Sequence, residues 1–392
     1  MGNKKLGIGI IGCGTISDIY LTNLTKNFDN VEVLACADMF LEKAEKAKET
    51  YGVKKACTVD ELIQDDNIAL VVNLTIPAAH FEINKRALEA GKHVYCEKPF
   101  TLSLKDAEEM AKLAKEKGLL IGSAPDTFLG AGLQTCRKLL DDGVIGTAVG
   151  FTANLVSPGH ELWHPAPLFY YQTGGGPMLD MGPYYLTALT ALLGPIKQLS
   201  CFAKTSQKKR PVQGKMIDVE VLTHYTGLIE FACGVIGNVN MSFDVWDSDL
   251  PLIEIYGTKG VMRVPDPNMF GGPVTVFDGE KMAEVVSRVE GDSINRLMKL
   301  HNCSEECLKE VDLLYPAEDI PRSNMRGFGV AEMAQAILDQ RPCRLSGEFS
   351  AHVIEALTGF EIAAKEQRVY QMKTTCKTPE PLAQGMKLWE VK

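Results

Sequence analysis

The stretch LGIGIIGCGTIS, residues 6–17, decides the fold of the first part of the chain. Its apolar run is typical of a strand that is buried on both faces of a parallel sheet. Gly12, Gly14 and Ser17 then occupy the positions of a G-x-G-x-x-G turn, with serine in the third place. The first glycine of such a turn permits a tight bend, and the second lets a pyrophosphate approach the backbone at the start of a helix. The stretch therefore predicts a strand, a dinucleotide-binding turn and a helix in succession.

Apolar runs and helical patterns alternate from this stretch to residue 124. The further strand-like runs are 31–38, 69–75, 93–97 and 119–124. The helical patterns between them are 40–52, 78–91 and 103–118. Such alternation predicts a doubly wound parallel sheet with helices on both faces. We therefore expect residues 1–124 to form a Rossmann domain.

The pattern changes after residue 125 and becomes rich in strands. One helical stretch, 129–143, precedes the strand-like runs 147–157, 199–206, 219–243, 252–264 and 274–279, and two helical stretches, 329–340 and 350–367, follow them. Repeated turn residues between these runs indicate a large, mainly antiparallel sheet. Residues 125–392 are thus expected to form an α+β domain, with ligands at the carboxyl ends of the parallel strands of the first domain.

Composition excludes several classes of partner. The chain has 392 residues, of which 45% are hydrophobic, and no apolar run reaches the roughly 18 residues that cross a bilayer. A net charge of −9 argues against nucleic acid and anionic membranes as partners. Eleven cysteines without a CxxC pair or a secretory signal favour a cytoplasmic, reduced chain. His301, Cys303 and Cys307 have no second ligand pair nearby, so we predict no metal site.

The acid at the end of the second strand favours NAD as the cofactor. Asp38 lies where a carboxylate accepts both ribose hydroxyls of NAD and repels a 2′-phosphate. Met39 and Phe40 follow it, so no arginine is present there to receive such a phosphate. We expect Thr15 and Ile16, which lie in the glycine turn, to contact the same cofactor.

NLTIPAAH, residues 73–80, is the next landmark on this side of the predicted site. Thr75 ends a strand, Pro77 suits the first position of a helix, and His80 lies in the first helical turn. We interpret all three as cofactor contacts. A helix start with a packed histidine explains the pattern about equally well.

GKHVYCEKP, residues 91–99, places two opposite charges at the end of another strand. Pro99 disfavours the α region at Lys98, which keeps that residue extended with its side chain directed off the strand end. Glu97 and Lys98 are therefore candidates for the chemistry. A second candidate segment is GGGPMLDMGPYY, residues 174–185.

Taken in order, these motifs resemble those of the glucose–fructose oxidoreductase, inositol dehydrogenase and rhizopine catabolism (Gfo/Idh/MocA) family. The resemblance covers nearly the whole chain, including RGFGVAEMA at 326–334, and the Glu-Lys-Pro element is its most diagnostic part. It implies an NAD(P)-dependent oxidoreductase of sugars, cyclitols or related polyols. It also implies that the open sheet of the second domain carries the substrate and packs against another subunit, so we expect a homo-oligomer.

The resemblance also implies roles for individual residues. Lys98 would lie near the nicotinamide and bond the reacting hydroxyl, Glu97 would contact the cofactor, and Asp180 would bind a substrate hydroxyl. Tyr184 departs from the family pattern, because many members carry an acid/base histidine at this position, although some carry tyrosine. An ordinary tyrosine has a pKa near 10, which is too high for a base at neutral pH. Lys98, the oxidised nicotinamide and a helix dipole would each favour the phenolate; Tyr185 is a rival phenol.

SPGHELWHPAPLFYYQ, residues 157–172, is an aromatic loop next to this segment. Aromatic rings stack on pyranose C–H faces, so the loop suits a carbohydrate, although a packed lid or a subunit contact explains it equally well. We expect His164 to touch the substrate, and a histidine from 160–164 is an alternative proton carrier to Tyr184. Asp126 and Thr127 follow the last Rossmann strand and are further candidates for the substrate pocket.

The leading hypothesis is an NAD-dependent dehydrogenase that transfers hydride from a sugar or glycoside hydroxyl, with C3 of a pyranoside as its sharper form. One alternative is a glycosidase or epimerase that oxidises its substrate transiently and retains the cofactor. Another is a non-catalytic, sugar-sensing co-repressor. Lys98, Asp180 and Tyr184 argue against the co-repressor, because a sensor needs no proton relay.

Overall fold

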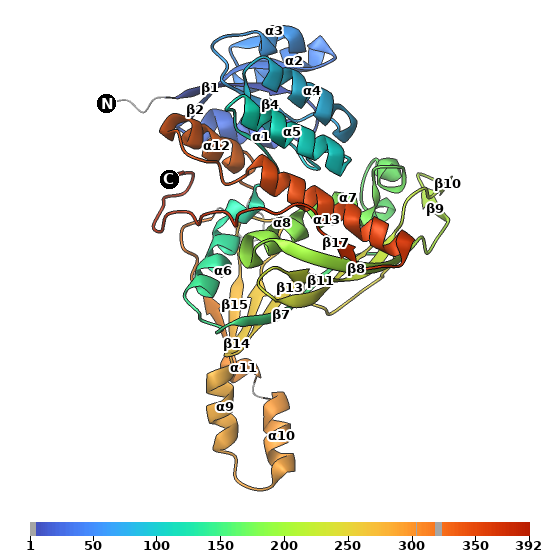
Figure 1. Cartoon of the computed structure of the whole chain (residues 1–392), viewed down its shortest axis with the longest axis vertical. Coiled ribbons are helices and arrows are strands. Elements are labelled where there is room, and N and C mark those ends of the chain that lie inside the picture. Colours follow the sequence, from blue (N-terminus) through green and yellow to red (C-terminus); the bar gives the residue numbers. More distant parts are fainter. Residues whose placement is uncertain (1–4, 303, 318–323) are drawn as a thin grey trace.

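The computed structural model describes residues 5–302, 304–317 and 324–392. Its N-terminal domain, at the top of Figure 1, is a six-stranded parallel sheet in the order β3-β2-β1-β4-β5-β6. The strands are β1 (Leu6–Ile11), β2 (Val31–Ala37), β3 (Lys55–Cys57), β4 (Leu70–Asn73), β5 (His93–Cys96) and β6 (Ile121–Ser123). The predicted Rossmann sheet is confirmed. Strand β3 lies outside the predicted elements, because three residues are too few for a periodic signal.

Helices cover both faces of this sheet, as the alternation predicts. They are α1 (Ser17–Lys26), α2 (Leu41–Tyr51), α3 (Val59–Ile63), α4 (Pro77–Glu89) and α5 (Leu104–Glu116). Local sequence sets their ends. The Ser103 side chain accepts a hydrogen bond from the Asp106 backbone N–H and caps α5, while Gly52 ends α2 in the left-handed conformation.

The second domain is built on a nine-stranded sheet in the order β16-β15-β14-β13-β7-β12-β11-β8-β17. Among the described strands of this sheet, only β7 and β12 are paired in parallel, so the mainly antiparallel sheet is confirmed. Its strands are β7 (Ala148–Val156), β8 (Ile196–Lys204), β11 (His224–Phe231), β12 (Ile236–Ser242), β13 (Ile253–Gly257), β14 (Gly260–Val264), β15 (Val274–Asp278), β16 (Leu308–Val311) and β17 (Tyr370–Gln371). A separate hairpin pairs β9 (Lys209–Val212) with β10 (Lys215–Asp218).

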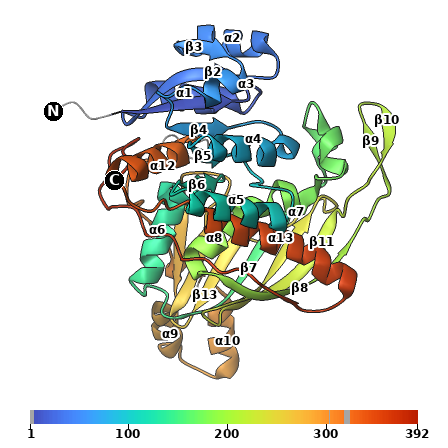
Figure 2. The same cartoon turned by 45° about the horizontal axis from the view of Figure 1, so that its top comes forward.

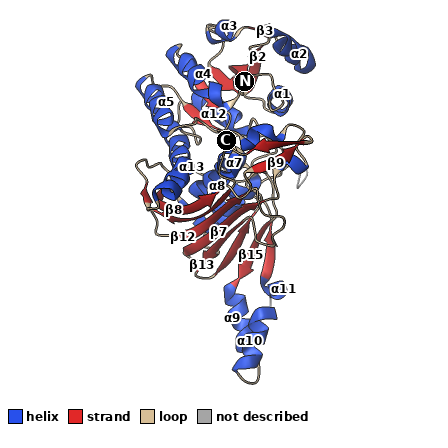
Figure 3. Cartoon of the chain, turned by 90° about the vertical axis from the view of Figure 1, so that its right-hand side faces the viewer, coloured by secondary structure: helices blue, strands red, loops and turns tan. Residues whose placement is uncertain are grey.

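Helices lie between the large sheet and the Rossmann domain, and the described elements leave the other face of the sheet open (Figure 3). The helices of this layer are α6 (Ala131–Asp141), α7 (Gly176–Asp180), α8 (Gly182–Leu193) and α13 (Gly347–Glu366). Helix α13 contacts both β8 and α5, and so it joins the two domains. Three short 3₁₀ helices complete this region: η1 (Thr127–Leu129), η2 (His160–Leu162) and η3 (Pro167–Tyr171).

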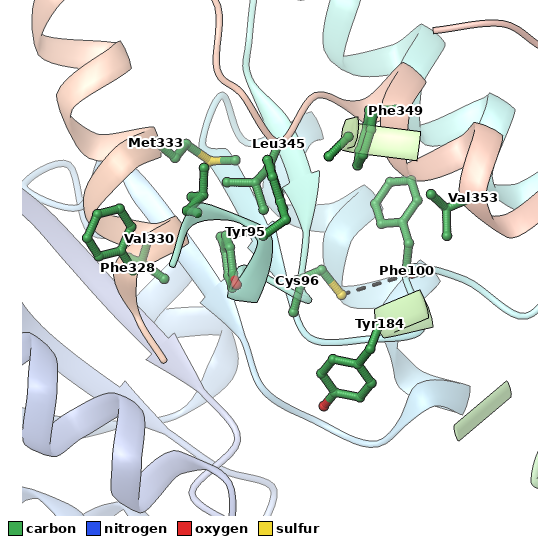
Figure 4. Close-up of a cluster of buried hydrophobic side chains, with 14 of the residues drawn as sticks. Tyr95, Cys96, Phe100, Tyr184, Phe328, Val330, Met333, Leu345, Phe349 and Val353 are labelled. Atoms are coloured by element: carbon green, nitrogen blue, oxygen red, sulfur yellow. Dashed lines mark hydrogen bonds between the residues drawn. The ribbon is translucent and has the colours of Figure 1, made fainter. Parts of the chain in front are cut away.

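The chain returns to the Rossmann domain near its C-terminus. Helix α12 (Phe328–Asp339) lies beside the parallel strands (Figure 2), and Phe28 packs edge-on against both Phe328 and Trp389. Figure 4 shows Tyr95 and Phe100 of the first domain in one apolar cluster with side chains of α12 and α13. A boundary at residue 124 therefore separates the two sheets, but it does not separate their hydrophobic cores.

A helical arm extends away from the body at the bottom of Figure 1. It consists of α9 (Gly279–Ser287) and α10 (Ser293–Asn302), with α11 (Ser304–Cys307) at its base. Both long helices of the arm are described in full, and none of their residues is buried. In the described part of the chain, no helix is long and apolar enough to cross a membrane.

Candidate active site

The glycine turn leaves an open cradle at the start of α1. Gly12 has φ +99°, and a Cβ at this position would lie only 2.7 Å from the Leu74 carbonyl carbon, so only glycine fits. A Cβ at Gly14 would meet no atom within 4 Å. The open space at Gly14, at the start of a helix, fits a pyrophosphate.

Asp38 lies at the edge of this cradle and is held by backbone donors. Its Oδ2 accepts a hydrogen bond from the Cys13 N–H at 2.8 Å, and its Oδ1 accepts one from the Phe40 N–H at 3.0 Å. Each carboxylate oxygen keeps further capacity to accept ribose hydroxyls. Three exposed apolar side chains that follow β1, β2 and β4 are suited to the faces of an adenine ring: Ile16 (36% exposed), Met39 (83%) and Ile76 (70%). Thr15 is also exposed in the turn.

The segment after β4 is ordered by its own side chains. Asn73 Oδ1 accepts hydrogen bonds from the Thr75 backbone N–H and Thr75 Oγ, and Pro77 opens α4. His80 is fully buried, with Nδ1 2.8 Å from the Pro99 carbonyl oxygen and Nε2 3.0 Å from that of Thr75. Burial lowers the pKa of His80. The structure thus places His80 behind the cofactor edge, as the packed histidine of the alternative interpretation and not as an open cofactor contact.

Glu97 is buried beneath the Lys98 turn. Its Oε1 accepts a hydrogen bond from the Tyr20 hydroxyl at 2.8 Å, and its Oε2 accepts one from the Lys98 backbone N–H at 2.7 Å. The Tyr20 and Tyr95 hydroxyls are 3.3 Å apart. These contacts connect the end of β5 to α1 and hold the backbone at Lys98 in position.

Lys98 and Asp180 form an ion pair across the two domains. Lys98 Nζ lies 3.1 Å from Asp180 Oδ1 and donates to the Asp180 carbonyl oxygen at 2.9 Å. Burial opposes the charge on Lys98, but Tyr184, Asp180 and Glu97 outweigh burial and raise its pKa above the usual value. Burial likewise opposes the charge on Asp180, but Lys98 and His160 outweigh it and lower the pKa of this carboxyl. Both groups therefore remain charged at neutral pH.

Tyr184 lies in the first turn of α8, next to this ion pair. Lys98 Nζ is 5.1 Å from the centre of the Tyr184 ring, and the hydroxyl accepts a hydrogen bond from Arg326 Nη2 at 3.3 Å. Figure 4 shows the Tyr184 hydroxyl pointing away from the apolar cluster. Tyr185, the rival phenol, is buried and donates to the Asn154 carbonyl oxygen at 3.2 Å. Burial raises the pKa of Tyr185, so it is the poorer candidate for a proton acceptor.

The aromatic loop brings His160, and not His164, to the ion pair. His160 Nε2 is 3.3 Å from Asp180 Oδ2, and its ring centre lies 4.0 Å from that of Tyr170, with the two rings tilted by 40°. His164 Nδ1 accepts a hydrogen bond from the Ala166 backbone N–H within its own loop, so it faces the loop on that side. Both histidines belong to the same short motif, and the sequence has no signal that separates them.

Arg210 of the β9–β10 hairpin anchors this loop. It is 1% exposed, donates to the Pro158 carbonyl oxygen at 2.9 Å and pairs with Glu161 at 2.6 Å. It also pairs with Asp244 at the end of β12. A buried arginine with two carboxylate partners fixes the loop firmly, because separating the charges would leave one of them buried without a partner.

Asp126 and Thr127 are buried, each 1% exposed, and do not face an open pocket. Asp126 Oδ2 accepts hydrogen bonds from the Gly327 N–H at 3.0 Å and the Gly329 N–H at 2.9 Å. Burial raises the pKa of the Asp126 carboxyl to about 6. The Asp126 carboxylate holds the start of α12, so the structure does not place it in the predicted substrate pocket.

Comparison with known proteins identifies both domains. Residues 6–124 match the NAD-binding Rossmann domain of the Gfo/Idh/MocA oxidoreductases, and residues 133–263 match the C-terminal domain of the same family. The chain belongs to the Gfo/Idh/MocA family. Its first domain is therefore an NAD-binding Rossmann domain, as the glycine turn and Asp38 predict.

Relatives within the Gfo/Idh/MocA family differ in substrate. Myo-inositol 2-dehydrogenase of Thermotoga maritima is 28% identical over 254 residues, which are 64% of this chain and 73% of that one. Inositol 2-dehydrogenase/D-chiro-inositol 3-dehydrogenase of Lactiplantibacillus plantarum is 36% identical, but over only 36% of this chain and 41% of its own. Levoglucosan dehydrogenase with NADH and levoglucosan superposes with a TM-score of 0.77 at 20% identity, over 94% of this chain and 99% of that one. At this identity the superposition shows a shared fold.

Two parts of the site were not predicted as such. Arg326 lies in the RGFGVAEMA motif, but nothing in the sequence relates that motif to Tyr184. His160 was considered only as one member of the 160–164 segment. Among the described residues, no group of three or more His, Cys, Asp or Glu side chains could hold a metal ion, and Cys303 lies outside them.

Proposed function

We propose that the chain oxidises a secondary hydroxyl of a sugar or polyol and passes the hydride to NAD. The observation that carries this proposal is the Lys98–Asp180 ion pair beside the Tyr184 ring, because it lies at the carboxyl edge of an NAD-binding sheet. A cation, a carboxylate and a phenol together can orient a hydroxyl and remove its proton.

NAD supplies one thing when it is bound, an acceptor for the hydride that leaves the carbon. The residues of the chain do the rest. Lys98 donates to the reacting oxygen and stabilises the negative charge that develops there, while Asp180 accepts a hydrogen bond from the reacting or the neighbouring hydroxyl. Tyr184, as the phenolate, takes the hydroxyl proton as the C–O bond becomes C=O. His160 positions Asp180, and the proton on Tyr184 then passes to solvent.

Asp38 makes NAD the preferred nucleotide over NADP. A 2′-phosphate would be placed against a carboxylate that the Cys13 and Phe40 N–H groups hold in position. The exposed side chains that follow it are Met39 and Phe40, and neither carries a positive charge.

The aromatic loop favours a pyranose or a glycoside as substrate. Trp163 and Phe169 are 66% and 54% exposed, and Phe169 stacks at 3.9 Å on Tyr170, which in turn stacks on His160 next to Asp180. Aromatic faces bind the C–H faces of sugars, and carboxylates bind their hydroxyls. Oxidation at C3 of a pyranoside is the sharpest form of the proposal. The names of the inositol dehydrogenases and of levoglucosan dehydrogenase indicate cyclic substrates, a cyclic polyol and an anhydrosugar. These names support the proposal that the substrate of this chain is a ring compound.

We propose further that the chain is cytoplasmic and forms a homo-oligomer through the open face of the large sheet. Phe202, Leu228 and Ile236 point from this face and are 79%, 60% and 60% exposed. Apolar side chains on an uncovered sheet are typical of a surface that another subunit buries.

One experiment tests the proposed reaction. The purified protein is denatured and the released nucleotide is identified; the native protein is then assayed with NAD on inositols, monosaccharides and methyl and aryl glycosides for NADH absorbance. Net NADH from a cyclic substrate supports the dehydrogenase, whereas conversion of a glycoside without net NADH supports the cofactor-retaining alternative. Near-normal turnover by Tyr184→Phe would refute the assignment of the proton acceptor, and no turnover on any carbohydrate would refute the enzyme.

A further inference from the structure

Arg326 reaches the site from the far end of the chain. It lies 142 residues beyond Tyr184, in the segment that leads into α12, and its Nη2 donates to the Tyr184 hydroxyl at 3.3 Å. The guanidinium carbon is also 5.9 Å from the centre of the Tyr184 ring. The reaction proposed above gives this arginine no role.

The guanidinium is fixed on both sides by amide oxygens. Its Nη2 donates to Asn268 Oδ1 at 2.6 Å, and its Nη1 donates to Asn324 Oδ1 at 2.9 Å. Both anchors are neutral, and within the described residues no carboxylate forms a salt bridge with Arg326.

The backbone beside Arg326 is equally well held. Asn23 of α1 donates from Nδ2 to the Asn324 carbonyl oxygen at 3.0 Å and to the Arg326 carbonyl oxygen at 2.8 Å. Asp126 Oδ2 accepts hydrogen bonds from the Gly327 and Gly329 backbone N–H groups, at the start of α12. A side chain on such a base can hold one geometry toward the phenol.

A guanidinium is a donor at every accessible pH. The Tyr184 oxygen that accepts from it can still accept a proton from a substrate hydroxyl, and it accepts both bonds better as an anion. Lys98 lies over the face of the same ring, so two cations from different domains flank one phenol. Among the described residues, the other ionisable groups near Tyr184 or Arg326 are Asp180, Tyr170, Glu97, Tyr20, Tyr95, Asp126 and Asp266.

We propose that Arg326 is a positioning residue that holds the Tyr184 hydroxyl and stabilises its anion, and that it completes with Lys98 a two-cation clamp on the proton acceptor. The inference rests on the proposed function and explains how this chain works where many relatives carry histidine. Before the chemical step Tyr184 loses its proton to solvent. In the step, its oxygen takes the proton of the substrate hydroxyl while the C–H electron pair leaves with the hydride for NAD.

The test compares full-length wild type with Arg326→Lys and Arg326→Met, in the presence of NAD and the substrate found above. We expect kcat/KM of Arg326→Met to fall about 10- to 100-fold, mainly in kcat, with its acidic limb moved to higher pH. In Arg326→Lys, which keeps a positive charge, the acidic limb of the pH profile of kcat/KM should lie between those of wild type and Arg326→Met. Arg288→Met is the matched control, because this arginine is 74% exposed at the end of α9 on the helical arm and should change neither value.

A second readout does not depend on turnover. The tyrosinate absorbance of wild type minus that of Tyr184→Phe, followed against pH, isolates the titration of Tyr184. The same difference measured in the Arg326→Met background should lie at higher pH. If Arg326→Met does not fold, Asn268→Ala keeps the charge, loosens its anchor and should give a smaller shift in the same direction.

Three outcomes would overturn the clamp. The first is an unchanged tyrosinate difference curve in Arg326→Met. The second is a lower melting temperature with the same kcat and pH profile per folded molecule. The third is weaker NADH binding at unchanged kcat, which would make Arg326 a cofactor ligand. If wild type shows no turnover, the proposed function is refuted. The interaction of Arg326 with Tyr184 is then tested by the tyrosinate difference curves alone.

Discussion

The cofactor edge and the substrate face of this site are built in different ways. The cofactor edge lines up residues that follow successive strands of one sheet: Gly12 after β1, Asp38 after β2, Thr75 after β4 and Lys98 after β5. The substrate face gathers His160, Asp180, Tyr184 and Arg326 from four segments that belong to no common strand order. At the cofactor edge, the alternation of strands and helices determines which residues are neighbours. At the substrate face, long-range packing determines it.

Lys98 lies between the cofactor edge and the substrate face, so its replacement should cause the largest fall in kcat/KM. In Lys98→Met the reacting oxygen loses its cation, and we expect kcat/KM to fall about 10³-fold or more. NADH affinity should be retained, because the glycine turn and Asp38 are untouched. Steady-state kinetics and fluorescence titration with NADH check this, and a parallel loss of NADH binding would show that the two halves do not act separately.

The glycine turn offers a matched pair of variants on the cofactor side. In Gly12→Ala the new Cβ overlaps the Leu74–Thr75 backbone at a left-handed φ, so we expect both weaker NADH binding and a loss of about 3 kcal/mol or more of unfolding free energy. In Gly14→Ala the new Cβ meets nothing in the protein, so only NADH affinity should fall. Urea unfolding and NADH titration of both variants distinguish a structural glycine from one that makes room for the cofactor.

Asp126, just after β6, connects the Rossmann domain to the start of α12. Its buried carboxyl should make the free energy of unfolding depend on pH. Its pKa is about 6 in the folded chain against a usual 3.8, so between these values the folded state keeps a proton that the unfolded state has lost. Stability should therefore fall as pH rises from about 4 to about 6, by about 3 kcal/mol from this group alone.

Asp126→Asn lacks this component of the pH dependence, and urea unfolding at a series of pH values measures it. Asp141→Asn, at an exposed carboxylate of α6, is the control and should leave the pH dependence of wild type unchanged. Parallel curves for wild type and Asp126→Asn would contradict the buried position of this carboxyl.

Phe169 should show the smallest effect, because it is more than half exposed on the substrate face. Phe169→Ala removes one aromatic face, and we expect KM for a pyranoside to rise about 2- to 10-fold, with little change in kcat or melting temperature. Leu297→Ala, at a comparably exposed apolar residue on the helical arm, is the control and should leave KM unchanged. Equal effects of the two variants on KM would exclude the aromatic loop from the substrate face.

Both domains, the NAD-binding turn and the Lys98 position follow from the sequence, because each depends on local patterns: buried apolar runs, helix caps, a glycine turn and a proline after the lysine. The resemblance adds Asp180 and Tyr184, whose segment is itself a local motif. The errors are of another kind. His80 lies in the first turn of α4 and Asp126 lies just after β6, and sequence alone does not say whether such a polar residue faces a ligand or backbone groups of the same chain.

Only the tertiary structure decided which groups surround Tyr184. The sequence by itself determined an NAD-binding Rossmann domain, a following mainly antiparallel sheet and the lysine between them. Arg326 lies next to Tyr184 because α12 folds back onto the first domain, and His160 reaches Asp180 because the buried Arg210 holds its loop. Those contacts join residues that are far apart in the chain. They depend on how two hydrophobic cores pack together, which no local pattern encodes.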